Sequence, residues 1–317
     1  MSITAVKIGR SLLKIANSIV NFVMLMIILL VIVFGSYALW DSEQVHYAAA
    51  AARYEVFKPT PANGGKSFEE LQAINPEVFG WLSVYGTRID YPIVQGEDNE
   101  KYVNTNAEGN YALSGSLFLA CENKKDFSEF NSIIFGHHME KQTMFGELGL
   151  FSEKQYFDAR RYGMLYYDGQ EHGLEFFAFL HTDAYDSAVY VSGIQNMEMR
   201  QQYLNHLLEK ASHTRDLKVR VTDHIVLLST CSVASTNGRD ILAARITGEL
   251  YQDNFETAPI NNTETAAVID ELSGVWRHIP IWLWLLIALR VIGCMVVGLV
   301  WLCDRVCSDR NEKKIKK

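Results

Sequence analysis

The sequence predicts a mainly β domain, a barrel or sandwich with inserted helices, between two transmembrane helices. Three observations lead to this prediction. Many short segments alternate or run apolar like strands and are separated by turn residues. One long amphipathic helix comes late in the order. An apolar segment near each end is long enough to cross the roughly 30 Å hydrocarbon layer of a membrane.

The two apolar segments are residues 19–40 and 279–303. The first contains no charge. It is longer than the core of a typical signal peptide, and no small-residue cleavage site follows it directly, so we expect a retained anchor rather than a cleaved leader. The second contains Arg290, for which we expect snorkelling to the membrane surface or a partner protein.

Charge is unevenly distributed along the chain. The segments outside residues 41–278 carry ten basic and three acidic residues, whereas residues 41–278 carry 19 basic and 34 acidic residues. Positively charged flanks stay in the cytosol, so both termini are predicted to be cytosolic and the acidic domain extracellular. The acidic domain also argues against a nucleic-acid partner, because it offers nothing to offset phosphate charge.

Within the domain, Ser67 is expected to begin a short helix that ends before Pro76. Residues 78–84 and 88–94 are predicted to be strands around the turn 85–87. An apolar stripe predicts the long helix over residues 197–211, and residues 143–155 show a rougher helical pattern. The other strands are expected at residues 116–120, 132–135, 164–167, 174–180, 218–221, 225–228 and 241–251.

One cysteine stands where a predicted strand gives way to a polar loop. Two polar residues follow the apolar run 225–228, and Cys231 comes next. The small polar loop after it can turn back and bring Arg239 towards the sulfur. Another apolar strand ends in Gly-His-His, at His137 and His138. Two strand ends that carry Cys and His, with an Arg nearby, form a candidate nucleophilic site.

These three side-chain types suffice for acyl transfer through a thioester. The thiolate of a cysteine attacks carbonyl carbons, and a nearby cation stabilises it. Histidine can protonate a leaving amine near neutral pH. Arginine does not act as a base, but its fork of donors can hold a substrate carbonyl or a developing oxyanion.

Other interpretations of the same residues stay open. Cys231 could be an inert buried side chain or could pair with Cys121, since these are the two cysteines of the predicted outer domain. Arg239 could be a solvated turn residue. His137 and His138 could lie in an ordinary loop or bind a metal. Adjacent histidines project apart, however, and no third ligand has suitable spacing, so neither a metal nor a cofactor is predicted.

The segments around these residues resemble the sortases, cysteine transpeptidases on the surface of Gram-positive bacteria. The run LLSTC, followed by Arg239, and the strand ending FGHHM are similar to the TLxTC, Arg and Gly-His signatures of that family. The resemblance covers most of residues 67–251 and is to the class B branch. The segments that carry it are INPEVFGWLSVYGTRIDYPIVQ, SGSLFL, DFSEFNSIIFGHHM and TMFGEL. It implies a closed β-barrel of about eight strands with N-terminal helices and a long helix before the cysteine strand.

The resemblance implies a role for each candidate residue. Cys231 would be the nucleophile, His137 the general acid and base because it directly follows the glycine, and Arg239 the oxyanion or substrate-positioning group. His138 stands where class B enzymes often have asparagine. Leu227 replaces the first threonine of the family motif, which we expect to change packing rather than activity. The implied substrates are secreted proteins with a C-terminal sorting signal, cleaved after threonine.

The second apolar segment departs from the class B pattern, since a C-terminal span is typical of the pilus-building class C. The lid motif of class C, Asp-Pro-aromatic, is not found ahead of the barrel. These two features leave the role open between protein anchoring and pilin polymerisation. The expected acceptor is an amine of the cell wall, from a peptidoglycan precursor, with the amine of a pilin lysine as the alternative. Plain hydrolysis by a cysteine endopeptidase and a non-catalytic receptor or adhesin are the rival functions.

The expected location is the cell membrane, with two spans. The expected segments are a cytosolic N-terminus (1–18), a transmembrane helix (19–40), an extracellular stalk (41–66), the catalytic domain (67–252), a linker (253–278), a second transmembrane helix (279–303) and a basic cytosolic tail (304–317).

Overall fold

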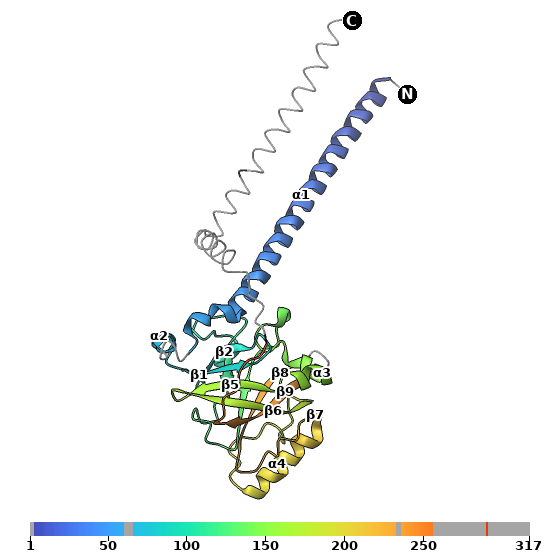
Figure 1. The fold of residues 1–317 in the computed structure, drawn as a ribbon. Helices are drawn as coiled ribbons and strands as arrows, with labels where there is room; N and C mark the ends of the chain where they lie inside the picture. Colours follow the sequence, from blue (N-terminus) through green and yellow to red (C-terminus); the bar gives the residue numbers. More distant parts are fainter. Residues whose placement is uncertain (1–2, 60–65, 233–235, 256–289, 291–317) are drawn as a thin grey trace. The chain divides into compact units, whose positions relative to one another are not determined.

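The computed structural model describes residues 3–59, 66–232, 236–255 and 290 (Figure 1). The chain divides into two compact units, Met1–Glu256 and Thr257–Lys317, and every strand described belongs to the first. Several predicted segments lie outside the described residues: part of the stalk, nearly all of the linker, the second transmembrane helix except Arg290, and the basic tail.

Within the described residues, eight strands close into a mixed barrel. Their order is β5-β1-β2-β3-β4-β8-β9-β6, and β6 pairs with β5 to complete the ring. Neighbouring strands are antiparallel except β2–β3 and β4–β8, which are parallel. The strands are β1 Val78–Val84, β2 Asp90–Val94, β3 Leu117–Leu119, β4 Asn131–Phe135, β5 Tyr162–Tyr167, β6 Gln170–Asp183, β8 His224–Cys231 and β9 Gly238–Thr247. The predicted closed barrel of about eight strands is therefore confirmed.

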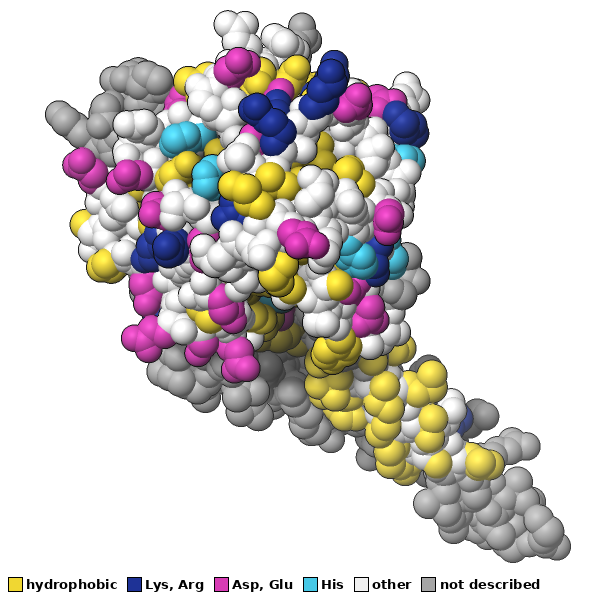
Figure 2. All heavy atoms as spheres, turned by 90° about the horizontal axis from the view of Figure 1, so that it is seen from below, with side chains coloured by type: hydrophobic (Ala, Val, Ile, Leu, Met, Phe, Trp, Pro, Cys, Tyr) yellow, Lys and Arg dark blue, Asp and Glu magenta, His cyan; other side chains and the backbone are white. Residues whose placement is uncertain are grey.

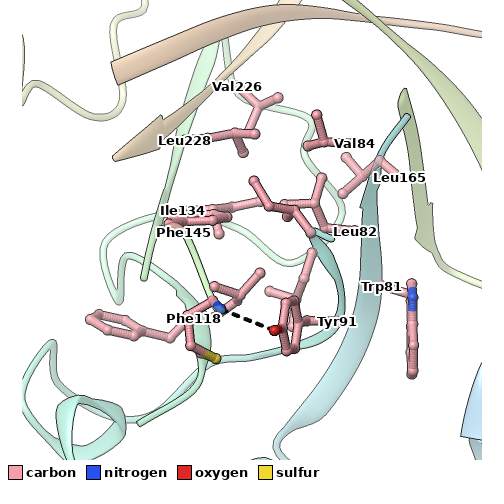
Figure 3. Close-up of a cluster of buried hydrophobic side chains, with 14 of the residues drawn as sticks. Trp81, Leu82, Val84, Tyr91, Phe118, Ile134, Phe145, Leu165, Val226 and Leu228 are labelled. Carbon is pink, nitrogen blue, oxygen red and sulfur yellow. Dashed lines mark hydrogen bonds between the residues drawn. The ribbon is translucent and has the colours of Figure 1, made fainter. Parts of the chain in front are cut away.

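Two apolar clusters lie on opposite faces of the strands β4, β8, β9 and β6. In β8, Val226 and Leu228 belong to the first cluster, whereas Ile225 and Leu227 belong to the second. This alternation follows from the two-residue period of a strand and separates the barrel interior from its outer face. Figure 3 shows part of the interior cluster, including Trp81, Leu82, Val84, Tyr91, Phe118, Ile134, Phe145, Leu165, Val226 and Leu228.

The long helix before the cysteine strand covers the outer face. This helix, α4 (Met197–Lys210), begins where the side chain of Asn196 accepts the backbone N–H of Glu198, a standard N-cap. Tyr203, Leu204 and Leu207 are its buried side chains, and all three belong to the second cluster. The amphipathic helix predicted from the sequence is confirmed, although it ends one residue earlier than expected.

The N-terminal helix α1 (Ile3–Ala49) contains the predicted anchor. Its segment Leu13–Ser42 contains an 18-residue window with a mean hydropathy of 2.8 and has no buried residue, so it is a candidate membrane span by length and composition. Figure 2 shows apolar side chains gathered along this helix, whereas the visible face of the barrel mixes acidic, basic and apolar side chains. The helix continues through Ala49, where a separate stalk was expected.

Two further helices are short: α2 (Lys66–Ile74) before β1, and α3 (Lys154–Ala159) before β5. The predicted first helix is thus confirmed, with Ser67 inside it. The rough helical pattern over residues 143–155 corresponds to the 3₁₀ helix Leu148–Ser152 and the start of α3, with a loop before them.

One predicted strand is wrong. Residues 218–221 form a loop, in which Lys218 has a φ of 50° that no strand residue adopts. The strand in this region is instead β7 (Ala211–Thr214), which pairs with the second half of β6 outside the barrel ring. The sequence of β7, ASHT, contains no apolar run, and its residues alternate between half-buried and exposed, so no local pattern could predict this strand.

Neighbouring leucines of α4 allow a matched test of the packing on the outer face. Leu207 is fully buried, whereas Leu208 is 42% exposed. We expect Leu207→Ala to lower the free energy of unfolding by about 2–5 kcal/mol, because it leaves a cavity between helix and sheet. Leu208→Ala, the control in the same helix, should change it by less than about 1 kcal/mol. Denaturant unfolding measures both; equal losses would contradict the packing described here.

Candidate active site

Strand register brings Cys231, Arg239 and His137 to one edge of the barrel. Cys231, the last residue of β8, stands directly opposite Arg239 on β9. On the other side of β8, the parallel ladder pairs Ser229 with Phe135 of β4. The N–H of the next residue, Gly136, donates to the Ser229 carbonyl oxygen at 3.2 Å. Phe135 and Ser229 are thus paired, and His137 and Cys231 each come two residues after their member of this pair.

Cys231 and Arg239 are directed to the outer face of the sheet. Ile225 and Leu227 belong to the outer cluster, and two further steps of the same alternation lead through Ser229 to Cys231. Directly opposite residues of an antiparallel pair share a face, so Arg239 lies on this face too. His137 lies two residues beyond the end of β4, in the loop that follows the strand.

Cys231 is accessible as well as positioned. Its side chain is exposed, and Cys231 and Cys121 are both free thiols. The disulfide that the sequence left open is therefore not formed, and Cys231 is not an inert buried side chain. Ser229 and Thr230 do not interrupt the strand as expected but continue it, so the thiol stands on the last residue of a hydrogen-bonded ladder.

One ring nitrogen of His137 is held by the backbone. Its Nε2 lies 2.8 Å from the carbonyl oxygen of Val103. A carbonyl oxygen only accepts hydrogen bonds, so Nε2 carries the proton and Nδ1 is the basic nitrogen of the neutral ring. The His137 carbonyl in turn accepts the N–H of Phe145 at 3.0 Å. Both the ring and the backbone of His137 thus have fixed partners.

Close packing explains the glycine before His137. A Cβ atom at Gly136 would lie 2.4 Å from Cδ2 of Leu117 and 2.7 Å from Cδ2 of Phe145. Contacts this short do not occur, so a larger residue would push the start of the histidine loop away from the barrel. Gly136 thereby sets how closely His137 approaches the sheet.

His138 takes no part in this arrangement. It forms an isolated β-bridge with Met144, and its Nδ1 is buried without a hydrogen-bond partner. Among the described residues, no three His, Cys, Asp or Glu side chains are grouped as metal ligands. The two adjacent histidines therefore have different environments. Successive side chains of an extended chain point to opposite sides, which is consistent with this difference.

Tyr190 is a site residue that sequence reasoning missed. Its hydroxyl lies 2.8 Å from Oγ of Ser229, and its ring stacks on Phe135 with the centroids 6.1 Å apart. Burial raises the pKa of Tyr190 to about 12, and the charges that act on it include those of Arg239 and Cys231. The one signal in the sequence is the apolar run 188–191 within an otherwise polar segment.

An open cavity of about 510 Å³ lies on the far side of the arginine strand, and its lining does not include Cys231, His137 or Arg239. Thr182 of β6 stands directly opposite Arg239, so Cys231, Arg239 and Thr182 form one row across three adjacent strands. Thr182 lines the cavity together with Asp183, Asp186 and Lys210. An exposed thiol opposite an arginine, with a histidine in the loop after the neighbouring strand, is an arrangement that suits covalent acyl transfer.

No family model matches the chain, but individual proteins do. Sortase B of Staphylococcus aureus is 26% identical over 236 residues, which cover 71% of this chain and 96% of that protein. The crystal structure of sortase B from the type II pilus of Streptococcus pneumoniae is 46% identical, with a TM-score of 0.51. The match covers 57% of this chain and 99% of that one.

A second pilus-associated structure is also similar. It is a class B sortase of Streptococcus pyogenes involved in pilus biogenesis, 39% identical with a TM-score of 0.52. The match covers 56% of this chain and 97% of that one. Each TM-score is moderate while nearly all of the matched structure is covered, because this chain extends beyond the barrel.

The packing around Gly136 gives a test of how the histidine is positioned. We expect Gly136→Ala to lower the free energy of unfolding by about 1–3 kcal/mol, because its methyl group overlaps Leu117 and Phe145. We also expect the amide NMR signals of residues 137–146 to shift. The control is Gly248→Ala, where a Cβ atom meets nothing within 4 Å. Similar unfolding free energies for the two variants would contradict the close approach.

Proposed function

The chain belongs to the class B sortase family, and from this premise we propose that Cys231, His137 and Arg239 are the catalytic residues of its transpeptidase activity. The observation that supports the proposal is the register of β4, β8 and β9, in which Cys231 pairs with Arg239 and the strand before His137 pairs with the cysteine strand, although His137 and Cys231 are 94 residues apart in sequence. The role of each is assigned from its chemistry and its position.

In the first half-reaction, the Cys231 thiolate attacks the carbonyl carbon of the threonine in a sorting signal. The negative charge that develops on the carbonyl oxygen is stabilised by the Arg239 guanidinium. His137 in its protonated form gives a proton to the leaving amine, the C–N bond breaks, and a thioester on Cys231 remains. The accessible thiol and the cavity beyond Arg239 support this step.

In the second half-reaction, an amine attacks the thioester carbon and forms a new amide bond. Neutral His137 takes the proton of the attacking amine, and the sulfur leaves as the thiolate. Water in place of the amine would give simple hydrolysis, the thiol endopeptidase outcome. Transfer is the expected main reaction, because the family is one of transpeptidases.

Secreted proteins with a C-terminal sorting signal are the proposed substrates. Segment Leu13–Ser42 of α1 is the proposed membrane anchor, with the barrel outside the cell. An enzyme anchored in this way would meet its substrates as they emerge from the membrane. The domain boundaries, the second transmembrane helix and the cytosolic position of both termini remain predictions from the sequence.

For the acceptor, a pilin lysine is a second candidate beside the cell-wall amine expected from the sequence. The observation that favours it is sequence identity. The two pilus-associated structures are 46% and 39% identical to this chain, whereas sortase B of Staphylococcus aureus is 26% identical. This difference is consistent with an enzyme that joins pilin subunits.

A trapped thioester tests the catalytic assignment. The full chain in detergent micelles, incubated with NPQTN-like and LPXTG-like peptides, should gain the mass of one acyl fragment. Cys231→Ala should form none. His137→Gln and Arg239→Ala should slow acylation by about 10²–10⁴-fold, because each removes a group that acts in the transition state.

The control for this experiment is His138→Asn, which alters the neighbouring imidazole and should leave acylation within about twofold of the parent. Loss of acylation in His138→Asn together with its retention in His137→Gln would reverse the histidine assignment. If no peptide acylates the parent chain while its thiol reacts with iodoacetamide, the sorting-signal proposal fails.

Competition between two amines tests the acceptor. Once an acylating peptide is known, a lysine-containing pilin peptide and a peptidoglycan cross-bridge peptide are supplied at equal concentration. We expect the pilin adduct to exceed the cross-bridge adduct by about tenfold, a difference of about 1.4 kcal/mol in transition-state binding. The reverse preference would assign the enzyme to cell-wall anchoring.

A further inference from the structure

The hydroxyl of Tyr91 connects the N-terminal helix to the histidine loop. Tyr91 lies on β2 and is 2% exposed. Its hydroxyl donates to the carbonyl oxygen of Ala49 at 2.9 Å and accepts the N–H of Met144 at 3.0 Å. Figure 3 shows Tyr91 within the interior cluster. One oxygen atom thus bonds two segments that are 95 residues apart in sequence.

On one side of this bridge is the end of α1. Ala49 is the last residue of the helix and is 1% exposed. The final carbonyls of a helix have no partner within the helix, and a buried carbonyl without a hydrogen bond is costly. Tyr91 satisfies the Ala49 carbonyl, so the position of the hydroxyl depends on where α1 ends.

On the other side is the loop that follows His137. Lys141, Gln142 and Met144 all have positive φ, at 56°, 60° and 53°, which non-glycine residues adopt at a cost. A loop in this conformation needs outside contacts to keep it. The Met144 N–H bond to Tyr91 is one such contact, and it lies next to the bond from the Phe145 N–H to the His137 carbonyl.

A phenylalanine would fill the same space in the core, so packing alone does not require the hydroxyl. Burial raises the pKa of Tyr91, with the Met144 hydrogen bond acting against that rise. The hydroxyl therefore keeps its proton and can donate to Ala49 throughout the range in which the enzyme works. It can bond both partners at once because a hydroxyl donates and accepts.

We propose that Tyr91 is a positioning residue that holds the His137 loop, and with it the His137 ring on the Val103 carbonyl, and that this hold depends on the end of α1. The inference rests on the proposed catalytic role of His137. It assigns to the N-terminal helix a part in ordering the active site, in addition to anchoring.

Tyr91→Phe in the full chain in micelles is the test. It leaves a phenyl ring in the core but removes the bonds to Ala49 and Met144. We expect kcat for peptide acylation to fall by about five- to tenfold with KM within twofold, because the bond to Met144, the one of the two that holds the histidine loop, is lost. The ¹⁵N spectrum of labelled histidine, assigned with His137→Gln, should change from Nε2-protonated His137 to a mixture of tautomers.

The matched control is Tyr54→Phe. Tyr54 is also buried and follows the same helix end, at the C-cap of the 3₁₀ helix Ala51–Arg53. Loss of the Tyr54 hydroxyl should lower thermal stability about as much as Tyr91→Phe does, and should leave kcat and the His137 tautomer unchanged. Equal loss of kcat in both variants, or an unchanged His137 spectrum in Tyr91→Phe, would overturn the proposal.

The same measurements distinguish failure of the proposed catalytic function from failure of the positioning role of Tyr91. If His137→Gln acylates as fast as the parent, the catalytic assignment of His137 fails. If His137→Gln is inactive and Tyr91→Phe matches the parent in kcat and tautomer, the catalytic assignment stands and the positioning role of Tyr91 is excluded.

Discussion

The parallel pairing of β4 with β8 is the interaction on which the active site depends. It sets side by side the two strands that lead to Cys231 and His137, although 94 residues separate these two residues in sequence. The antiparallel pairing of β8 with β9 adds the guanidinium from the opposite side. Backbone hydrogen bonds fix all three positions, so the geometry does not rely on flexible side chains finding one another.

The closed barrel makes this register rigid. The strands that carry the site are covered on both faces, by the interior cluster on one side and by α4 on the other. Shifting one strand by a residue would move its apolar side chains to the wrong face, which strongly disfavours any alternative pairing. The stability of the fold and the alignment of the reactive groups therefore have the same physical origin.

The sequence could predict the features that leave a local pattern. Apolar runs gave the strands that end near Cys231 and His137, and the apolar stripe gave α4. The local motifs singled out the three candidate residues. Contacts between distant segments leave no such pattern. The hydrogen bonds of Tyr190 with Ser229 and of Tyr91 with Met144 join residues 39 and 53 positions apart, and nothing near either tyrosine indicates its partner.

The errors in the sequence analysis have the same origin. Polar Ser229 and Thr230 were expected to interrupt a strand, yet both continue it, because β9 pairs with both residues and β4 pairs with Ser229 on the other side. The short strand β7 forms because β6 is longer than β5 and has an edge left to pair. Such pairings are set by the whole sheet and become visible only when the strands are assembled.

The shared face of Cys231 and Arg239 has a consequence for how such enzymes diversify. Each of the two residues is placed by counting in steps of two along a strand, so loss or gain of one codon within β8 would turn the thiol towards the barrel interior. The number of residues in a loop between strands does not determine the face on which a strand side chain lies. Related enzymes should therefore vary in the length of their loops, where substrate preference can change, while these strands keep their length.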